Sequence, residues 1–214
     1  DVYKRQIEQL AYDGENLSRS GDVVVVSVNH RLNVLGYLDL SPFGEKYRDS
    51  ANAGNLDLIA ALEWIRDNIE GFGGDPENVT LFGQSGGGVK VWSLLQMPEA
   101  DGLFHKGIIE SGVVDPDLLG DAEDGNGREI VKAMLAELGL EEKDVDQLET
   151  LPYDQLAQAY ENAAPKVAQK GEYVGNHPHK NQSYFGDAIK HGFREETKKI
   201  PLLIGTCLLY TSDA

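Results

Sequence analysis

Apolar residues in the first half of the chain alternate between strand-like runs and one helical pattern. Residues 23–28 are valine at every position except Ser27 and show no polar–apolar alternation, which predicts a strand buried on both faces. Residues 53–68 carry apolar residues at helical spacing, and residues 78–82 and 107–110 predict two further buried strands. Residues 32–52 are expected to run over the surface. Strands that alternate with helices favour an α/β fold with a parallel sheet.

The second half has a different pattern, which is helical and acidic from residue 115 onward. Three helices are predicted, over residues 128–138, 141–149 and 154–164. Residues 171–193 are polar, aromatic and irregular, so no regular element is expected there. Residues 201–205 are again apolar and predict a return to the sheet.

A serine framed by glycines joins the strand at 78–82 to a helical pattern that begins near Gly86. The sequence Gly83-Gln84-Ser85-Gly86-Gly87 fits the nucleophile elbow of α/β-hydrolases, a tight strand-to-helix turn that exposes the serine. We expect a strained backbone at Ser85 and a need for glycine two positions to either side. A bare match is common in a glycine-rich chain, and the alternative is a flexible turn whose serine caps a helix. The flanking strand and helix favour the elbow.

The longer segment 68–87 closely resembles the type-B carboxylesterases, which include the para-nitrobenzyl-esterase-like enzymes and the cholinesterases. Three other segments resemble the same family: residues 23–32, 102–112 and 200–206. The chain departs from the family pattern at three positions. His30 replaces a tyrosine, Gln84 replaces the glutamate before the serine, and Gly86 replaces the alanine after it. Gly86 still offers its backbone N–H.

This resemblance implies an incomplete α/β-hydrolase domain over residues 7–206. Its parts would be a core sheet with the elbow at 7–114, a helical lid-like region at 115–195 and a return strand at 196–206. The implied function is a serine carboxylic-ester hydrolase that acts on a small-molecule ester through an acyl-enzyme on Ser85, with the Gly86 N–H in the oxyanion hole. The alternative is a non-catalytic binding or adhesion relative on the same fold. Such relatives usually lack the nucleophile, so Ser85 argues against it.

The other parts of the implied site are expected to be missing from the chain. The family's glycine-rich oxyanion loop would end before Ile7. Its catalytic glutamate would match Tyr210, and its histidine would follow later. A serine hydroxyl is a weak nucleophile without a base, so we expect this fragment to be inactive although its parent is an esterase.

Several other polar residues have simpler explanations. Arg31 and Asp57 are expected to form a buried salt bridge rather than to act as catalysts. Ser111 follows a strand, and it either caps the strand end or supports the catalytic centre, as the equivalent serine does in the resembling family.

The histidines near these segments also give no catalytic assignment. His30 and His105 violate the serine, acid, histidine order of α/β-hydrolases and are expected to be structural. His177 and His179 lack an evident third ligand, so an exposed loop is favoured over a metal site. No cofactor and no metal are expected.

The two ends of the chain have an unusual origin. DNA able to encode residues 207–213 contains the reverse complement of nearly all of the DNA able to encode residues 1–6, as in the mosaic end of a sequencing-library transposon. Residues 1–6 and 207–214 are therefore expected to be adapter-derived and to pack poorly. The single cysteine, Cys207, lies in this tail.

Composition excludes some partners. The net charge of −17 argues against nucleic acid and anionic membranes as partners. No apolar run is long enough to cross a bilayer. Because the natural N-terminus is expected to be missing, the sequence leaves localisation open, and it gives no oligomeric state.

Overall fold

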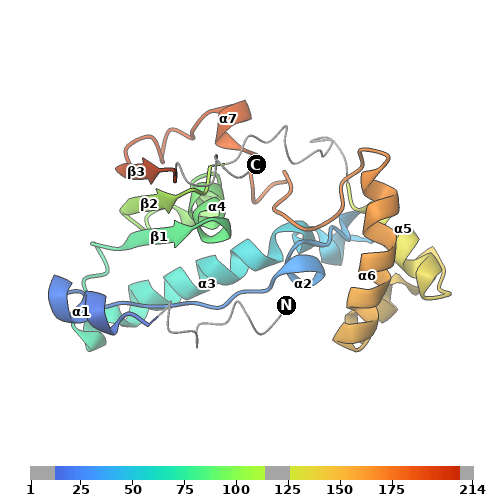
Figure 1. Cartoon of the computed structure of the whole chain (residues 1–214), viewed down its shortest axis with the longest axis horizontal. Helices are drawn as coiled ribbons and strands as arrows, with labels where there is room; N and C mark the ends of the chain where they lie inside the picture. Colours follow the sequence, from blue (N-terminus) through green and yellow to red (C-terminus); the bar gives the residue numbers. More distant parts are fainter. Residues whose placement is uncertain (1–12, 114–125, 208–214) are drawn as a thin grey trace.

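The computed structural model describes residues 13–113 and 126–207. Within these residues the sheet has three parallel strands in the order β1-β2-β3. They are β1 (Thr80–Gln84), β2 (Lys106–Glu110) and β3 (Leu202–Gly205). Figure 1 shows the sheet toward one end of the molecule, the long helix α3 through its centre, and α5 and α6 at the opposite end.

The helices have the following bounds. The α-helices are α1 (Glu15–Gly21), α2 (Asn33–Tyr37), α3 (Ala53–Asn68), α4 (Gly86–Leu94), α5 (Arg128–Glu137), α6 (Tyr153–Ala168) and α7 (Ala188–His191). Short 3-10 helices are η2 (Ser41–Phe43), η3 (Glu45–Tyr47), η4 (Ser50–Asn52), η5 (Ile69–Phe72), η6 (Pro98–Ala100) and η8 (Glu142–Glu149).

Two apolar clusters form the core. One lies between the sheet and helices α3 and α4, and it includes Leu62, Leu95 and Ile109. The other joins α2 to α5 and α6 through residues such as Val34 and Met134. Leu95, Ile109 and Met134 are fully buried. The centre of each cluster is thus shielded from solvent, and the removal of apolar surface from water stabilises the helices around it.

Most of the predicted elements are confirmed. The helix at 53–68 and the strands at 107–110 and 201–205 are present within one residue of their predicted bounds. The strand predicted at 78–82 lies two residues later, at Thr80–Gln84. The three helices of the second half are present, although the middle one is a 3-10 helix. Residues 171–193 are irregular apart from the single turn of α7.

The prediction of a buried strand at 23–28 is wrong. These residues belong to no strand and no helix. Four of their five valines are open to solvent, with exposed fractions from 39% at Val26 and Val28 to 45% at Val23, and Val25 is partly buried. Among the described residues no strand pairs with this segment, so its backbone groups lack the ladder that defines a strand. An apolar run predicts burial only where a neighbour is present to bury it.

The prediction of a surface excursion at 32–52 is also wrong. Val34, Tyr37, Leu38 and Leu40 are buried. Val34, Leu38 and Leu40 pack in the cluster formed with α5 and α6. Those helices lie about a hundred residues further along the chain, and local patterns give no sign of so distant a contact. The adapter-derived ends predicted at 1–6 and 207–214 lie outside the described residues, except for the exposed Cys207.

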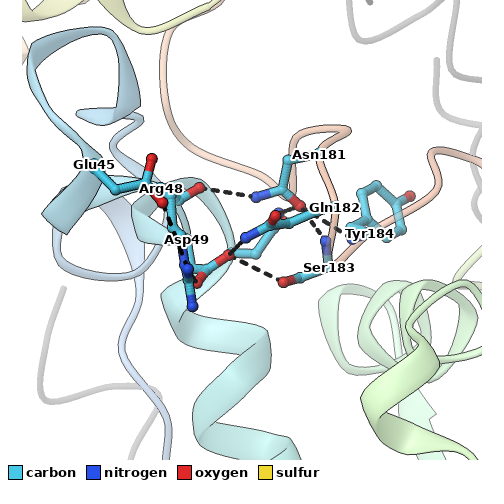
Figure 2. Close-up of polar contacts among 8 residues, drawn as sticks. Glu45, Arg48, Asp49, Asn181, Gln182, Ser183 and Tyr184 are labelled. Atoms are coloured by element: carbon cyan, nitrogen blue, oxygen red, sulfur yellow. Dashed lines mark hydrogen bonds and ion pairs between the residues drawn. The ribbon is translucent and has the colours of Figure 1, made fainter.

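The irregular segment 171–193 is tied to the first half of the chain by side-chain hydrogen bonds. Figure 2 shows residues 181–184 beside Arg48 and Asp49. The Asn181 amide donates to the Arg48 carbonyl at 3.2 Å, and the Ser183 hydroxyl donates to the Asp49 carboxylate at 3.0 Å. Burial alone would raise the pKa of Asp49, but donors from Gln182, Arg48 and Ser183 lower it. The carboxylate therefore stays ionised and anchors this loop.

A second set of bonds fastens the same segment to α4. The indole N–H of Trp92 donates to the Asp187 carboxylate at 3.0 Å. The fully buried Gln96 donates its amide to the carbonyls of Gly186 and Gly192, both at 3.0 Å. Residues 183–193 therefore hold one side of the helix that follows the predicted elbow.

A buried polar chain holds the other side of α4. The Tyr37 hydroxyl donates to Asn55 Oδ1 at 3.0 Å, and Asn55 Nδ2 donates to Ser93 Oγ at 2.8 Å. These residues come from α2, α3 and α4, and all three are at most 2% exposed. Because buried polar groups are costly without partners, this chain fixes how the three helices meet.

We expect Asn55→Ala to lower the free energy of unfolding by roughly 1–3 kcal/mol, because it leaves the buried Tyr37 hydroxyl without its acceptor. The matched control is Asn162→Ala, whose amide is bonded at the surface of α6, and it should change stability by less than about 0.5 kcal/mol. Urea denaturation measures both. Equal effects of the two substitutions would contradict the role given to the polar chain.

Candidate active site

Ser85 lies at the junction between β1 and α4. Its backbone has φ 53° and ψ −119°, a region that non-glycine residues rarely occupy and that marks stored strain. The Ser85 N–H donates to the Glu110 carbonyl at 2.8 Å, and the Val89 N–H donates to the Ser85 carbonyl at 3.0 Å. These bonds hold the strained residue between strand and helix. The predicted strained conformation is confirmed.

The glycines two positions before and two positions after Ser85 have different surroundings. A methyl group on Gly83 would lie 2.5 Å from the Gly87 carbonyl oxygen, whereas one on Gly87 meets no described atom within 4 Å. Glycine is therefore required before the serine, and the expectation that it is equally required after it is wrong. A side chain on Gly83 would point at the backbone of Gly87, whereas one on Gly87 would point into open space.

A second close approach sets α4 against the sheet. A methyl group on Gly112 would lie 2.5 Å from the carbonyl carbon of Gly88 and 2.8 Å from the nitrogen of Val89. The first turn of α4 thus touches the backbone just beyond β2. No larger residue would fit at this contact without moving the helix.

The first turn of α4 follows Ser85 directly. Gly86 begins the helix, and the first N–H groups of a helix have no acceptor within the helix. They also lie at the positive end of the helix dipole. A methyl group built on Gly86 meets no described atom within 4 Å, so the described residues leave space beside it.

Arg31 and Asp57 form the predicted ion pair. The guanidinium and backbone N–H of Arg31 both donate to the Asp57 carboxylate, at 2.7–3.2 Å. Partial burial would raise the pKa of Asp57, but the Arg31 bonds lower it. The pair is less buried than expected, because the Arg31 side chain is 53% exposed.

Ser111 connects the ends of β2 and β3. It has φ 51°, its N–H donates to the Gly205 carbonyl at 2.7 Å, and its hydroxyl accepts from the Cys207 N–H at 3.2 Å. These contacts fit a strand-end cap. A supporting role in catalysis stays a prediction.

The histidines contact backbone groups. His30 Nδ1 donates to the Arg31 carbonyl at 2.8 Å, and His105 Nδ1 accepts from the Val79 N–H at 3.2 Å. Burial chiefly lowers the pKa of His30, so its ring is neutral at pH 7. Both contacts agree with the predicted structural roles. Tyr173 packs against His177 and His179.

One partly buried charged residue on α4 was missed by the sequence patterns. Lys90 lies on α4 and is partly buried, with Nζ 4.1 Å from the centroid of the Tyr37 ring. A lysine within the first two turns of an otherwise apolar helix was the available signal.

Residues 2–208 match the model of the carboxylesterase family. The chain belongs to the carboxylesterase family. The para-nitrobenzyl esterase of Bacillus subtilis (strain 168) is 39% identical to it over 218 residues, which cover 95% of this chain and 41% of that protein. The chain therefore spans about two-fifths of the length of that relative.

Solved structures of carboxylesterases confirm the fold. An esterase from Clostridium hathewayi, described as able to hydrolyse aliphatic aromatic polyesters, is 58% identical with a TM-score of 0.89. The match covers 93% of this chain and 39% of that one. The carboxylesterase Est55 of Geobacillus stearothermophilus is 34% identical with a TM-score of 0.74, covering 91% of this chain and 39% of that one. The predicted partial α/β-hydrolase fold is thus confirmed.

The glycine asymmetry gives a direct test within one motif. We expect Gly83→Ala to lower the free energy of unfolding by about 1–3 kcal/mol through overpacking. Gly87→Ala should be neutral or slightly stabilising, because alanine is favoured over glycine in a helix. Urea unfolding of both variants makes the comparison, and a larger loss for Gly87→Ala would overturn this account of the turn.

Proposed function

We propose that this chain is part of a longer serine carboxylesterase in which Ser85 forms an acyl-enzyme. The observation that carries the proposal is the strained backbone of Ser85 at the strand-to-helix junction, directly before the open N-terminus of α4. A turn that only capped a helix would not need φ 53° at a serine. Membership in the carboxylesterase family supports the same reaction.

The proposed reaction follows from this geometry. Ser85 Oγ attacks the ester carbonyl carbon while a base takes its proton, and the carbonyl oxygen becomes an oxyanion. The Gly86 N–H donates to that oxyanion; one such donor is typically worth about 2.7–4 kcal/mol of barrier. The alcohol leaves with a proton from the same base, and water then releases the acid from Ser85.

The base and its acid partner are proposed to come from sequence outside this chain. His30 and His105 are held by backbone groups, and neither has the chain order of the family's base. The position matched to the catalytic acid, Tyr210, lies outside the described residues. With one member of the triad and part of the oxyanion hole, the 214-residue chain alone is proposed to be inactive.

The substrates of the relatives suggest which esters to try. Small-molecule carboxylic esters are the first class, and the Clostridium hathewayi esterase adds polyesters as a second. A non-catalytic binding role is the other candidate. It is less supported, because non-catalytic relatives on this fold usually lack the nucleophile, whereas this chain keeps Ser85.

In the complete protein we expect Ser85→Ala to reduce kcat/KM for p-nitrophenyl butyrate by at least about a thousandfold. Ser20→Ala, on the exposed helix α1, is the matched control and should leave the rate unchanged. Full activity of Ser85→Ala would refute Ser85 as the nucleophile.

The 214-residue chain itself should hydrolyse p-nitrophenyl butyrate no faster than its own Ser85→Ala variant, because a serine without a base stays protonated. The measurement is turnover by both purified chains at equal concentration. Ser85-dependent turnover by this chain would refute the proposal that the base lies elsewhere.

A further inference from the structure

Residues 23–28, with the sequence Val-Val-Val-Val-Ser-Val, have the composition of a self-pairing strand. Short segments of high β-propensity without charge, proline or glycine pair readily with copies of themselves, and this segment meets each of these conditions. Figure 1 shows it within the blue stretch that leads from α1 toward α2. The segment belongs to no strand and no helix, so it is not part of the sheet formed by β1, β2 and β3.

Three alternate valines of this segment are open to solvent. Val24, Val26 and Val28 have exposed fractions of 41%, 39% and 39%. Val25 points instead toward the turn before α1, because a methyl group on Gly14 would lie 2.4 Å from its Cγ1. Clustered exposed apolar residues mark an interaction surface. Alternate residues of a strand face the same side, so the three exposed valines form one apolar row when the segment pairs as a strand.

The edge strands of the described sheet are less suited to pairing between copies. β1 and β3 are its edges. Gly83 lies within β1, and β3 begins directly after Pro201 and ends at Gly205. Glycine weakens a strand, and proline cannot donate a hydrogen bond to the ladder. Because residues 23–28 contain neither, this segment is the more favourable place to add a strand.

We propose that copies of the 214-residue chain associate through residues 23–28, which pair as antiparallel strands between two copies. The register that keeps every valine within the ladder sets Val24 of one copy opposite Ser27 of the other. The backbone N–H and C=O groups of the two segments then bond to one another. Cross-strand contacts between valines also remove apolar surface from water. This association does not depend on the proposed reaction.

Charge favours the antiparallel orientation. Parallel strands in register would place the Asp22 carboxylates of the two copies side by side, and like charges directly opposite each other destabilise a strand pair. In the antiparallel register Asp22 lies opposite Asn29, which is uncharged. The net charge of −17 on each copy opposes association at longer range, and salt screens this repulsion. Association should therefore strengthen as the salt concentration rises.

The test measures the mass of the purified chain by sedimentation velocity in about 0.2 M NaCl, where the repulsion is largely screened. All proteins carry Cys207→Ser, so that no native thiol contributes a disulfide. The chain should form dimers or larger species. Val26→Lys should raise the dissociation constant by at least about tenfold, because a lysine on a free strand discourages pairing. The matched control, Ile189→Lys on α7, replaces a side chain that is 53% exposed, and it should associate like the Cys207→Ser chain.

Cysteine cross-linking tests the orientation separately. Val24→Cys and Ser27→Cys, each in the Cys207→Ser chain, are oxidised alone and as a mixture. The antiparallel register predicts more disulfide-linked dimer in the mixture than in either variant alone, since residues opposite each other have neighbouring Cβ atoms. Parallel strands in register would instead link each variant to itself.

Several results would overturn the proposal. A chain that stays monomeric would do so, and so would equal effects of Val26→Lys and Ile189→Lys on the dissociation constant. A mixture that gives no more cross-linked dimer than either cysteine variant alone would also refute it. If Val26→Lys does not fold, as judged by circular dichroism, the cross-linking alone decides.

Discussion

The contact between the first turn of α4 and the sheet is the constraint on which the site depends. Gly83 lies against the backbone of Gly87, and Gly112 lies against Gly88. These approaches leave no room for side chains, so the helix begins directly at the end of β1. Ser85 must then turn the chain within one residue, which explains its φ of 53°. The stored strain is the cost of a serine that faces outward at the end of the strand.

The rest of the described structure keeps this helix in place. The buried chain from Tyr37 through Asn55 to Ser93 holds one side, and the segment with Asp187 holds the other through Trp92. These anchors come from residues far apart in sequence. A rigid α4 fixes both the proposed nucleophile and the N–H groups beside it, which is what preorganised catalysis requires.

The sequence predicted the elbow because its signal is local. Glycine, serine and the apolar spacing of strand and helix all lie within about twenty residues. The failures at 23–28 and 32–52 have the opposite cause, since burial there depends on partners that local patterns do not reveal. Lys90 was missed for the same reason: its environment is made by Tyr37 and His30, which belong to another part of the chain. The difference in space around Gly83 and Gly87 depends on how the backbone folds back at the turn, so only the structure could reveal it.

The central claim is that the strained Ser85 is the nucleophile of a carboxylesterase. Reaction of the complete protein with a fluorophosphonate, followed by peptide mapping by mass spectrometry, tests it most directly, since the reagent bonds covalently to an activated serine. The account predicts a single phosphonylated residue, Ser85, and loss of esterase activity in step with labelling. Complete inhibition with the label on another residue, and none on Ser85, would contradict it.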